Sequence, residues 1–430
     1  MALRFARLRD SLRSSLWFTP TVLVGIAFIL AEGALRFDQR SDSRESNWFL
    51  FGGGAESARS VVETIATSML TFTGLVFTIT MLVLQLASNQ FSPRVMRTFL
   101  RDRGNQFVLG TFVATYVYAL LVLRRITNAA EADAFVPALS VWIALILVLF
   151  SIALFIYYIH HIAQSIRPTS VMARVANETQ HAIEHLYPAG IGDGAAPVAE
   201  PEWPVATTIV LSPGPSGLLT RIDESQIAAV ARDSRCLIEL RATLGDFVRE
   251  GAPLFRISGA WDGNADARLQ DAVNFGVERT MDQDAAFGFR QLVDIGQRAL
   301  SPGINDPSTA VQAIDQLHSL LGHLVRREIP PAWRELDGSW IILPRPSWAD
   351  FVTLACDEIR EAGRRQIQVQ RRLRAMLLDL LEVASPERRA PLEEQLLLLD
   401  ADLSESFDDR ERTRAATPSS QGQGPASRFP

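Results

Sequence analysis

Small and polar side chains recur along one face of an uncharged segment, residues 64–91, that is long enough to cross a membrane. At a rise of ~1.5 Å per residue, a helix of this length spans roughly 40 Å, against a hydrocarbon core of about 30 Å. Steps of three and four residues place these side chains on a single helical face. We call this face the polar stripe, and only Met81 interrupts it. The stripe consists of Thr64, Thr67, Thr71, Gly74, Thr78, Gln85 and Ser88.

The polar stripe has two interpretations. Small polar residues are what membrane helices place against one another, because they allow close backbone approach and hydrogen bonds across the contact. Alternatively, the stripe lines a water-filled path, since Gln85, Ser88, Asn89 and Gln90 keep it polar up to the end of the segment. Packing is the commoner use. Val76 lies off the stripe, and we expect it to face lipid.

Four arginines follow the striped segment closely: Arg94, Arg97, Arg101 and Arg103. If several chains assemble, these arginines would form a basic ring at the cytoplasmic mouth of a path, and such a ring favours anions. The competing interpretation is that they orient the protein and bind anionic lipid, which is the usual role of basic clusters beside a membrane.

A signature turn, residues 301–307, joins two helical stretches of the C-terminal half. Asp306 suits a helix N-cap, and Pro307 suits the first helical position. Free N–H groups at such a turn could hold an anion, but proline removes one donor and the aspartate brings its own negative charge. We therefore expect capping. The turn reads Ser301, Pro302, Gly303, Ile304, Asn305, Asp306 and Pro307.

The remaining candidate sites are weaker. His181 and His185 have the i, i+4 spacing of a metal pair on a helix, but no third ligand is evident nearby, so no metal is expected. Arg290, Asp294 and Arg298 stand four residues apart, as in a surface ion-pair ladder. No nucleophile elbow, nucleotide loop or metalloprotease pair occurs. We expect no cofactor, and an enzyme is the least favoured class.

Four apolar segments predict four transmembrane helices, at residues 16–35, 64–91, 107–123 and 136–162. Within the third, Gly110 and Ala114 have the small-residue spacing that lets helix backbones approach closely. The predicted fold class is a membrane α-helical domain of four transmembrane helices, followed by a cytoplasmic α+β domain. That domain is expected to contain a small barrel-like β-module and long C-terminal helices.

Arginine bias predicts the orientation, because basic residues are enriched on the cytoplasmic side of a membrane. The side that carries both termini has ten arginines: Arg4, Arg7, Arg9, Arg13, Arg94, Arg97, Arg101, Arg103, Arg167 and Arg174. The other side has six: Arg36, Arg40, Arg44, Arg59, Arg124 and Arg125. The expected location is a bacterial inner membrane, with both termini in the cytoplasm.

Composition divides the chain further. The expected domains are a four-helix transmembrane domain (1–165), a connecting helix and linker (166–204), a small β-module (205–260), a mostly helical domain (261–412) and a disordered tail (413–430). The β-module should contain strands at 207–211, 217–222, 237–241 and 253–257, with a helix at 225–231. Helices are expected over 265–300, from 307 to about 327, over 348–383 and over 386–407, and a strand at 340–343.

Two blocks of sequence resemble a family of predicted bacterial membrane proteins, known as the domain of unknown function 2254 family. The first block runs from Gln85 to Arg94 and continues through Phe99, Asp102, Gln106 and the run 109–112. The second comprises 287–290, Asp294, Ile295, and 298–307 followed by Thr309 and Ala310. The resemblance covers nearly the full length and implies a bacterial inner membrane protein. It implies no activity.

Residues 245–254 also resemble the tight turn of biotinyl and lipoyl domains, in which one glycine opens the turn and another closes it. Those domains carry their cofactor on a lysine. Because this chain contains no lysine, the cofactor-carrier function is excluded.

Two functions remain open. The first is a homo-oligomeric ion channel or transporter with its path along the second transmembrane helix. The second is a non-catalytic, membrane-anchored sensor or scaffold with a cytoplasmic binding module. The expected partners are the lipid bilayer, anionic lipids and further copies of the chain, and no nucleic acid.

Overall fold

The computed structural model describes residues 17–40, 54–90, 103–126, 136–165, 167–191, 208–259, 261, 263–336 and 339–419. Contacts between residues divide the chain into two compact units, Met1–Ser170 and Val171–Pro430.

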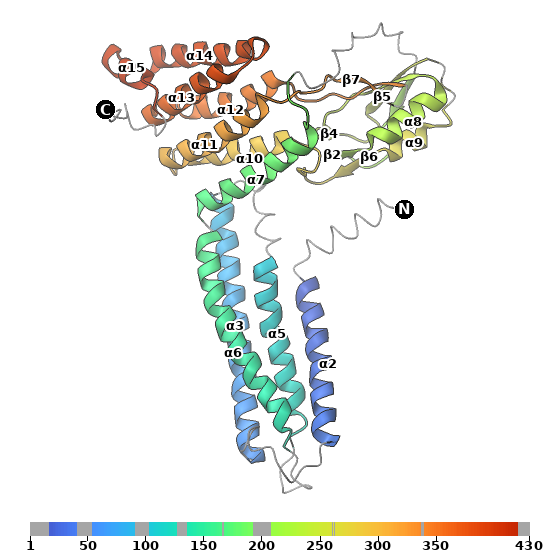
Figure 1. Ribbon diagram of the computed structural model, residues 1–430, viewed down its shortest axis with the longest axis vertical. Coiled ribbons are helices and arrows are strands. Elements are labelled where there is room, and N and C mark those ends of the chain that lie inside the picture. Colours follow the sequence, from blue (N-terminus) through green and yellow to red (C-terminus); the bar gives the residue numbers. More distant parts are fainter. Residues whose placement is uncertain are drawn as a thin grey trace. The chain divides into compact units, whose positions relative to one another are not determined.

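The first unit contains the four helices that were predicted, each long and apolar enough to cross a membrane. They are α2 (Phe18–Arg40), α3 (Ala55–Gln90), α5 (Arg103–Leu123) and α6 (Ala138–Ser165). α5 lies between α2 on one side and α3 and α6 on the other (Figure 1). Accordingly 56% of its apolar stretch is buried, against 22% or less for the other three helices.

Small residues and paired polar groups hold α5 in this bundle. A Cβ added at Gly110 would lie 2.7 Å from Leu23 Cδ1 and 3.0 Å from Pro20 Cα, so glycine permits the close approach of α2 that its spacing with Ala114 predicted. Within the bundle, the Tyr118 hydroxyl donates to the Ser140 carbonyl (3.1 Å).

The N-terminus of α6 is capped by a residue of α2. The Asp38 carboxylate accepts hydrogen bonds from the backbone N–H groups of Leu139 (3.1 Å) and Ser140 (3.0 Å) and from the Ser140 hydroxyl (2.7 Å). A carboxylate at this position satisfies otherwise unpaired amides and complements the helix dipole. The contact therefore ties the end of α2 to the start of α6.

The second unit begins with most of α7 (Pro168–Leu186) and continues with strands and short helices. Its strands are β1 (Thr208–Leu211), β2 (Gly217–Ile222), β3 (Leu237–Leu240), β4 (Phe247–Val248), β5 (Pro253–Ser258), β6 (Val273–Gly276), β7 (Trp333–Leu336) and β8 (Ser339–Ile342). Two helices lie among them, α8 (Glu224–Ser234) and α9 (Asp266–Asp271).

These strands form two sheets and no closed barrel, so the expected barrel-like module is not what the described strands build. One sheet has the order β1-β5-β3-β8-β7, and the other has the order β4-β2-β6. Pairing is antiparallel except between β3 and β8. β3 pairs with β5 on one side and with the distant strand β8 on the other, and the local turn pattern carries no signal for this second pairing. Gly245 (φ 91°) and Gly251 (φ 69°) do flank β4, as the turn resemblance implied.

The remaining helices are α10 (Ala285–Ala299), α11 (Pro307–Leu324), α12 (Trp348–Ala362), α13 (Ile367–Val383), α14 (Pro386–Ser406) and α15 (Asp409–Ala416). Within this unit α11–α15 lie at one end and the strands with α8 and α9 lie at the other (Figure 1). α10 packs against α11 and α12, and buries both Phe289 and Leu292 completely.

Two expected helices and the expected tail differ from the structure. Residues 265–300 form α9, β6 and α10, because β6 pairs with β2 and Asp284 starts a new helix. Residues 348–383 form two helices, α12 and α13, because α12 ends at its C-cap, Gly363. A Cβ added at Gly363 would lie 2.4 Å from Val369 Cγ1, so the close packing there requires glycine. α15 extends to Ala416, so the first residues of the expected disordered tail are helical.

Candidate functional site

The polar stripe lies on the outer face of the first unit. Thr64, Thr67, Thr71, Gly74, Thr78 and Gln85 are all exposed, and a Cβ added at Gly74 would meet nothing within 4 Å. The side chain of Ser88 lies outside the described residues. The helix spacing predicted from the sequence thus places these residues on one face, and the described part of the bundle leaves that face uncovered.

The threonine hydroxyls of the stripe donate to the backbone of their own helix. Thr71 donates to the Thr67 carbonyl (3.0 Å) and Thr78 to the Gly74 carbonyl (2.8 Å), and Thr64 and Thr67 follow the same i−4 arrangement. By contrast Thr80, which is off the stripe, also contacts the Tyr158 hydroxyl at 2.8 Å. The hydroxyls of these threonines therefore have hydrogen-bond acceptors within α3 and need none from another helix. The stripe consists of short side chains that lie close to the helix backbone.

The opposite face of α3 packs into the bundle. It buries Val62, Met69, Val76 and Val83, among others. Val76 therefore does not face lipid as expected, because it packs in a cluster with Phe112 and Tyr158. Large apolar side chains that flank the stripe are exposed instead, namely Leu70, Leu75, Phe77 and Leu82.

The side chains of the basic mouth all lie outside the described residues. Arg94, Arg97 and Arg101 lie outside the described residues. Arg103 begins α5, but its side chain is not described.

The signature turn joins α10 to α11 and is a structural cap, as predicted. The Asp306 carboxylate accepts from the Thr309 backbone N–H (3.1 Å) and hydroxyl (2.6 Å), and Pro307 is the first residue of α11. Asn305 has a left-handed backbone (φ 49°), and its side-chain oxygen accepts from Gln366 (3.0 Å). Pro302 and Gly303 are exposed, and Ser301 donates to the Arg298 carbonyl (2.7 Å).

Arg290 lies at the α10–α12 contact and not on an open surface. Its guanidinium contacts Asp294 (2.7 Å) and Glu358, to which Nη2 donates at 2.5 Å. The Arg290 side chain is 22% exposed, and the hydrogen bond to Glu358 raises its pKa. Arg290 therefore joins α10 to α12 and is not part of a surface ladder only. The sequence spacing gave no sign of Glu358, because this residue lies on a different helix.

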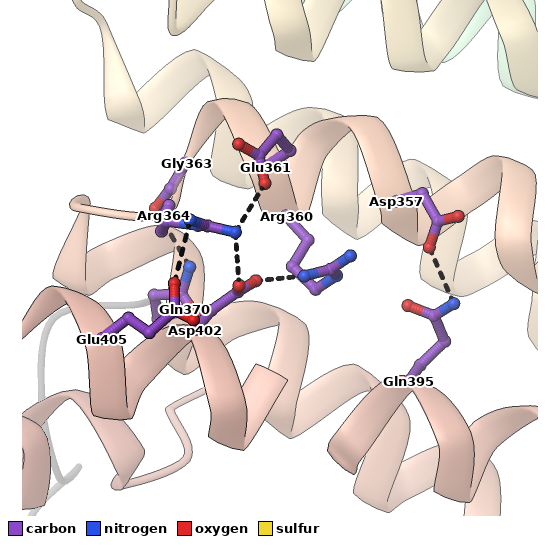
Figure 2. Close-up of polar contacts among 9 residues, drawn as sticks. All are labelled: Asp357, Arg360, Glu361, Gly363, Arg364, Gln370, Gln395, Asp402 and Glu405. Carbon is purple, nitrogen blue, oxygen red and sulfur yellow. Dashed lines mark hydrogen bonds and ion pairs between the residues drawn. The ribbon is translucent and has the colours of Figure 1, made fainter. Parts of the chain in front are cut away.

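A second polar cluster was not predicted at all. Asp402 of α14 is buried and pairs with Arg360 of α12 and with Arg364 (2.9 Å), as Figure 2 shows. Arg364 also contacts Glu361 (3.0 Å) and Glu405 (3.3 Å). The cluster fixes α14 across the end of α12. No local signal marks it, because its partners lie some forty positions apart in the sequence.

No metal site forms in the described ranges, where no group of three or more His, Cys, Asp or Glu side chains converges. His181 is exposed and lies 3.7 Å from Glu184, and His185 is also exposed.

Comparison of the sequence with known proteins finds a matching family. The sequence model of a family described as "Predicted membrane protein (DUF2254)" matches residues 13–379. Uncharacterised proteins of Mycobacterium tuberculosis and Mycobacterium bovis are each 35% identical over 403 residues, which cover 91% of this chain and 76% of the relative. No solved structure matched the chain.

Proposed function

We propose, from the premise that this chain belongs to the DUF2254 family of predicted membrane proteins, that it is a homo-oligomeric channel or transporter. Its path would run between copies of the chain, along the polar stripe of α3. Its location would be a bacterial inner membrane, with both termini in the cytoplasm.

The observation that carries this proposal is the exposure of the stripe. Six of its residues face away from their own bundle, while apolar residues such as Phe77 and Leu82 flank them. A face of glycine and threonine gains less from lipid contact than leucine and phenylalanine do, and such faces mark close helix contacts in membranes. Further copies of the chain are the partners that would cover it.

The interior of the single bundle supports a path between copies rather than through one copy. Large side chains fill the centre, including Met69, Phe112, Tyr118 and Tyr158, each of them fully buried. Phe72 stacks on Phe155 with ring centroids 5.0 Å apart. Solvated pores need a wider enclosure than four such closely packed helices provide.

The runner-up function is a membrane-anchored sensor or scaffold, in which the stripe only packs. The hydroxyls favour this alternative, because Thr71 and Thr78 already donate to their own helix. Such hydroxyls present a smooth contact surface.

Substitution of Thr78 separates the two functions. In a wet path the charge of Thr78→Asp is solvated, so the protein should assemble with altered ion flux. In a dry helix contact the same charge costs at least ~2.5–3.5 kcal/mol, and assembly should fail. Oligomer size in detergent and ion flux in vesicles are the measurements.

Two control variants make this test specific. Thr78→Val keeps the shape without the hydroxyl, and should assemble under either function. Phe77→Asp places the same charge on the exposed, apolar flank at the same depth, so it should impair insertion under both. An assembled Thr78→Asp protein with wild-type flux would contradict the channel.

A further inference from the structure

A histidine, an arginine and two aspartates meet where α11 packs against α13. His318 and Asp315 belong to α11, and Arg372 and Asp379 belong to α13. The side chain of His318 is 23% exposed and that of Arg372 is 6% exposed. Little water separates these two side chains, so the charge of one acts strongly on the other.

The two ring nitrogens of His318 have different partners. Nη2 of Arg372 lies 2.8 Å from Nδ1, and the Asp379 carboxylate lies 2.8 Å from Nε2. A guanidinium can only donate, so Nδ1 is the acceptor, and a carboxylate accepts, so Nε2 carries the proton. The contact therefore requires a neutral imidazole in a single tautomer.

Arg372 is held in place on its other side. Its Nε donates to the Asp315 carboxylate at 2.6 Å. A proton added to Nδ1 of His318 would face the guanidinium, so two donors and two like charges would oppose each other. Asp379 would attract the imidazolium, but its side chain is 64% exposed, so water screens that attraction. The hydrogen bond between His318 and Arg372 is thus incompatible with a charged histidine.

The pKa of His318 follows this geometry. Burial lowers the pKa of His318 below its ordinary value and the charge of Arg372 lowers it further, whereas Asp379 and Asp315 raise it. A histidine whose pKa is lowered in the folded protein takes up its proton more readily in the unfolded chain. Its contribution to stability is therefore complete above about pH 6.5, the pKa of an unperturbed histidine, and is lost progressively as the pH falls below that value.

The other charged side chains of the helices at this contact have different surroundings. α10 and α12 also pack against α11, and Arg290 and Asp294 of the former contact each other and, through Arg290, Glu358 of the latter. Four more charged residues of α12 and α13 contact α14 or α15, namely Asp357, Arg360, Arg371 and Arg374. Asp350 caps α12, Glu361 pairs with Arg364, and three residues are exposed, namely Arg298, His323 and Glu382. Arg372, Asp379 and Asp315 are therefore the charges that act on His318 at this contact.

We propose that His318 and Arg372 form a pH-sensitive contact, which holds α13 against α11 at neutral pH and loosens when the imidazole takes up a proton. In the protonated state Nδ1–H and the guanidinium repel each other, and α13 separates from α11. α15 packs on α13 and would loosen with it. The contact lies within the second unit, and the proposal does not rest on the channel function.

Deuterium exchange of the α13 amides, followed by mass spectrometry of the full-length protein in detergent, tests the contact at about pH 7.5 and about pH 5.5, on either side of the ordinary histidine pKa. Division by the intrinsic exchange rate at each pH leaves only the change in protection. We expect protection of α13 in the wild type to fall about three- to tenfold at the lower pH, since about tenfold is the ceiling for one histidine titrated one unit below its unperturbed pKa. His318→Gln cannot take up the proton, and its protection should change less than about twofold.

Two further variants make the test specific. His323→Gln, at an exposed histidine of the same helix, is the matched control and should lose protection as the wild type does. His318→Asn is a second neutral replacement, so the result does not depend on how glutamine packs. No loss of protection in the wild type, a gain at the lower pH, or an equal loss in the wild type and both His318 variants would each overturn the proposal. None of these results depends on ion flux or oligomer size, so they do not decide the channel proposal.

Discussion

Threonine hydroxyls in the first unit differ in the partner to which they donate. Thr78, in the stripe, donates only within α3, to the Gly74 carbonyl at 2.8 Å. Thr80, two residues on, also reaches Tyr158 of α6, and Thr115 of α5 lies 3.3 Å from the Ser151 hydroxyl. Inside the bundle a threonine hydroxyl thus contacts a neighbouring helix. In the stripe the hydroxyl is hydrogen-bonded to its own helix and makes no such contact with the described residues.

At the residue scale, Asp306→Ala should destabilise the second unit by about 0.5–2 kcal/mol, because it removes the acceptor for the Thr309 amide. Asp306→Asn keeps a side-chain oxygen and should be nearly neutral. Urea unfolding of the full-length variants measures both. Equal stability of the alanine variant and the wild type would show that the cap contributes nothing.

Local residue patterns explain why this cap was predictable and other contacts were not. Asp306 and Pro307 carry their signal in two adjacent positions. The pairing of Asp402 with Arg360, and that of Arg290 with Glu358, depends on which helices meet in three dimensions. The spacing of residues in a single sequence does not indicate which helices pack against each other.

At the element scale, α7 and α10 approach each other more closely than any residue but glycine allows at position 288. A Cβ there would lie 1.8 Å from the Thr179 Oγ1 atom and 2.7 Å from its Cβ. Gly288→Ala should therefore force the helices apart and cost about 1–3 kcal/mol.

Gly322→Ala is the matched control for this substitution. Gly322 also lies within a helix, but a Cβ there would meet nothing within 4 Å. Alanine should stabilise that position by about 0.5–1 kcal/mol through its helix propensity. Melting temperatures of the two variants should move in opposite directions. A shift in the same direction would contradict the close packing of α7 on α10.

Element type was predictable wherever the pattern was strong and local. The four apolar helices and the strand at 217–222 occur as expected, because length and hydropathy define the former and turn residues bound the latter. β6 was missed because Val273 and Phe275 form a strand only by pairing with β2, some fifty positions earlier. A strand was expected at the position of β8, but its pairing with the distant strand β3 was not, and the described strands form two sheets and no closed barrel.

At the scale of the whole molecule, the arginine bias predicts the orientation in the membrane. Reporter fusions placed after Arg167 should report the cytoplasm, and fusions within residues 38–56 should report the periplasm. A phosphatase and fluorescent-protein pair gives opposite signals on the two sides. Extracytoplasmic signal from the C-terminal fusion would reverse the proposed topology.

Assembly through α3 is the central claim, and cysteine cross-linking tests it most directly. The native Cys236 and Cys356 are buried, and burial raises the pKa of Cys236 to about 11 and that of Cys356 to about 12, so neither thiol competes. Position 74 is open, so Gly74→Cys fits without strain. Phe77→Cys, on the exposed apolar flank, is the control.

A short bis-maleimide added to native membranes should convert Gly74→Cys to a species of twice the 47.6 kDa chain mass, and should leave Phe77→Cys largely monomeric. This result would place the stripes of neighbouring chains face to face. Equal cross-linking of both variants, or a monomeric Gly74→Cys protein, would contradict assembly through α3 and with it a path between copies.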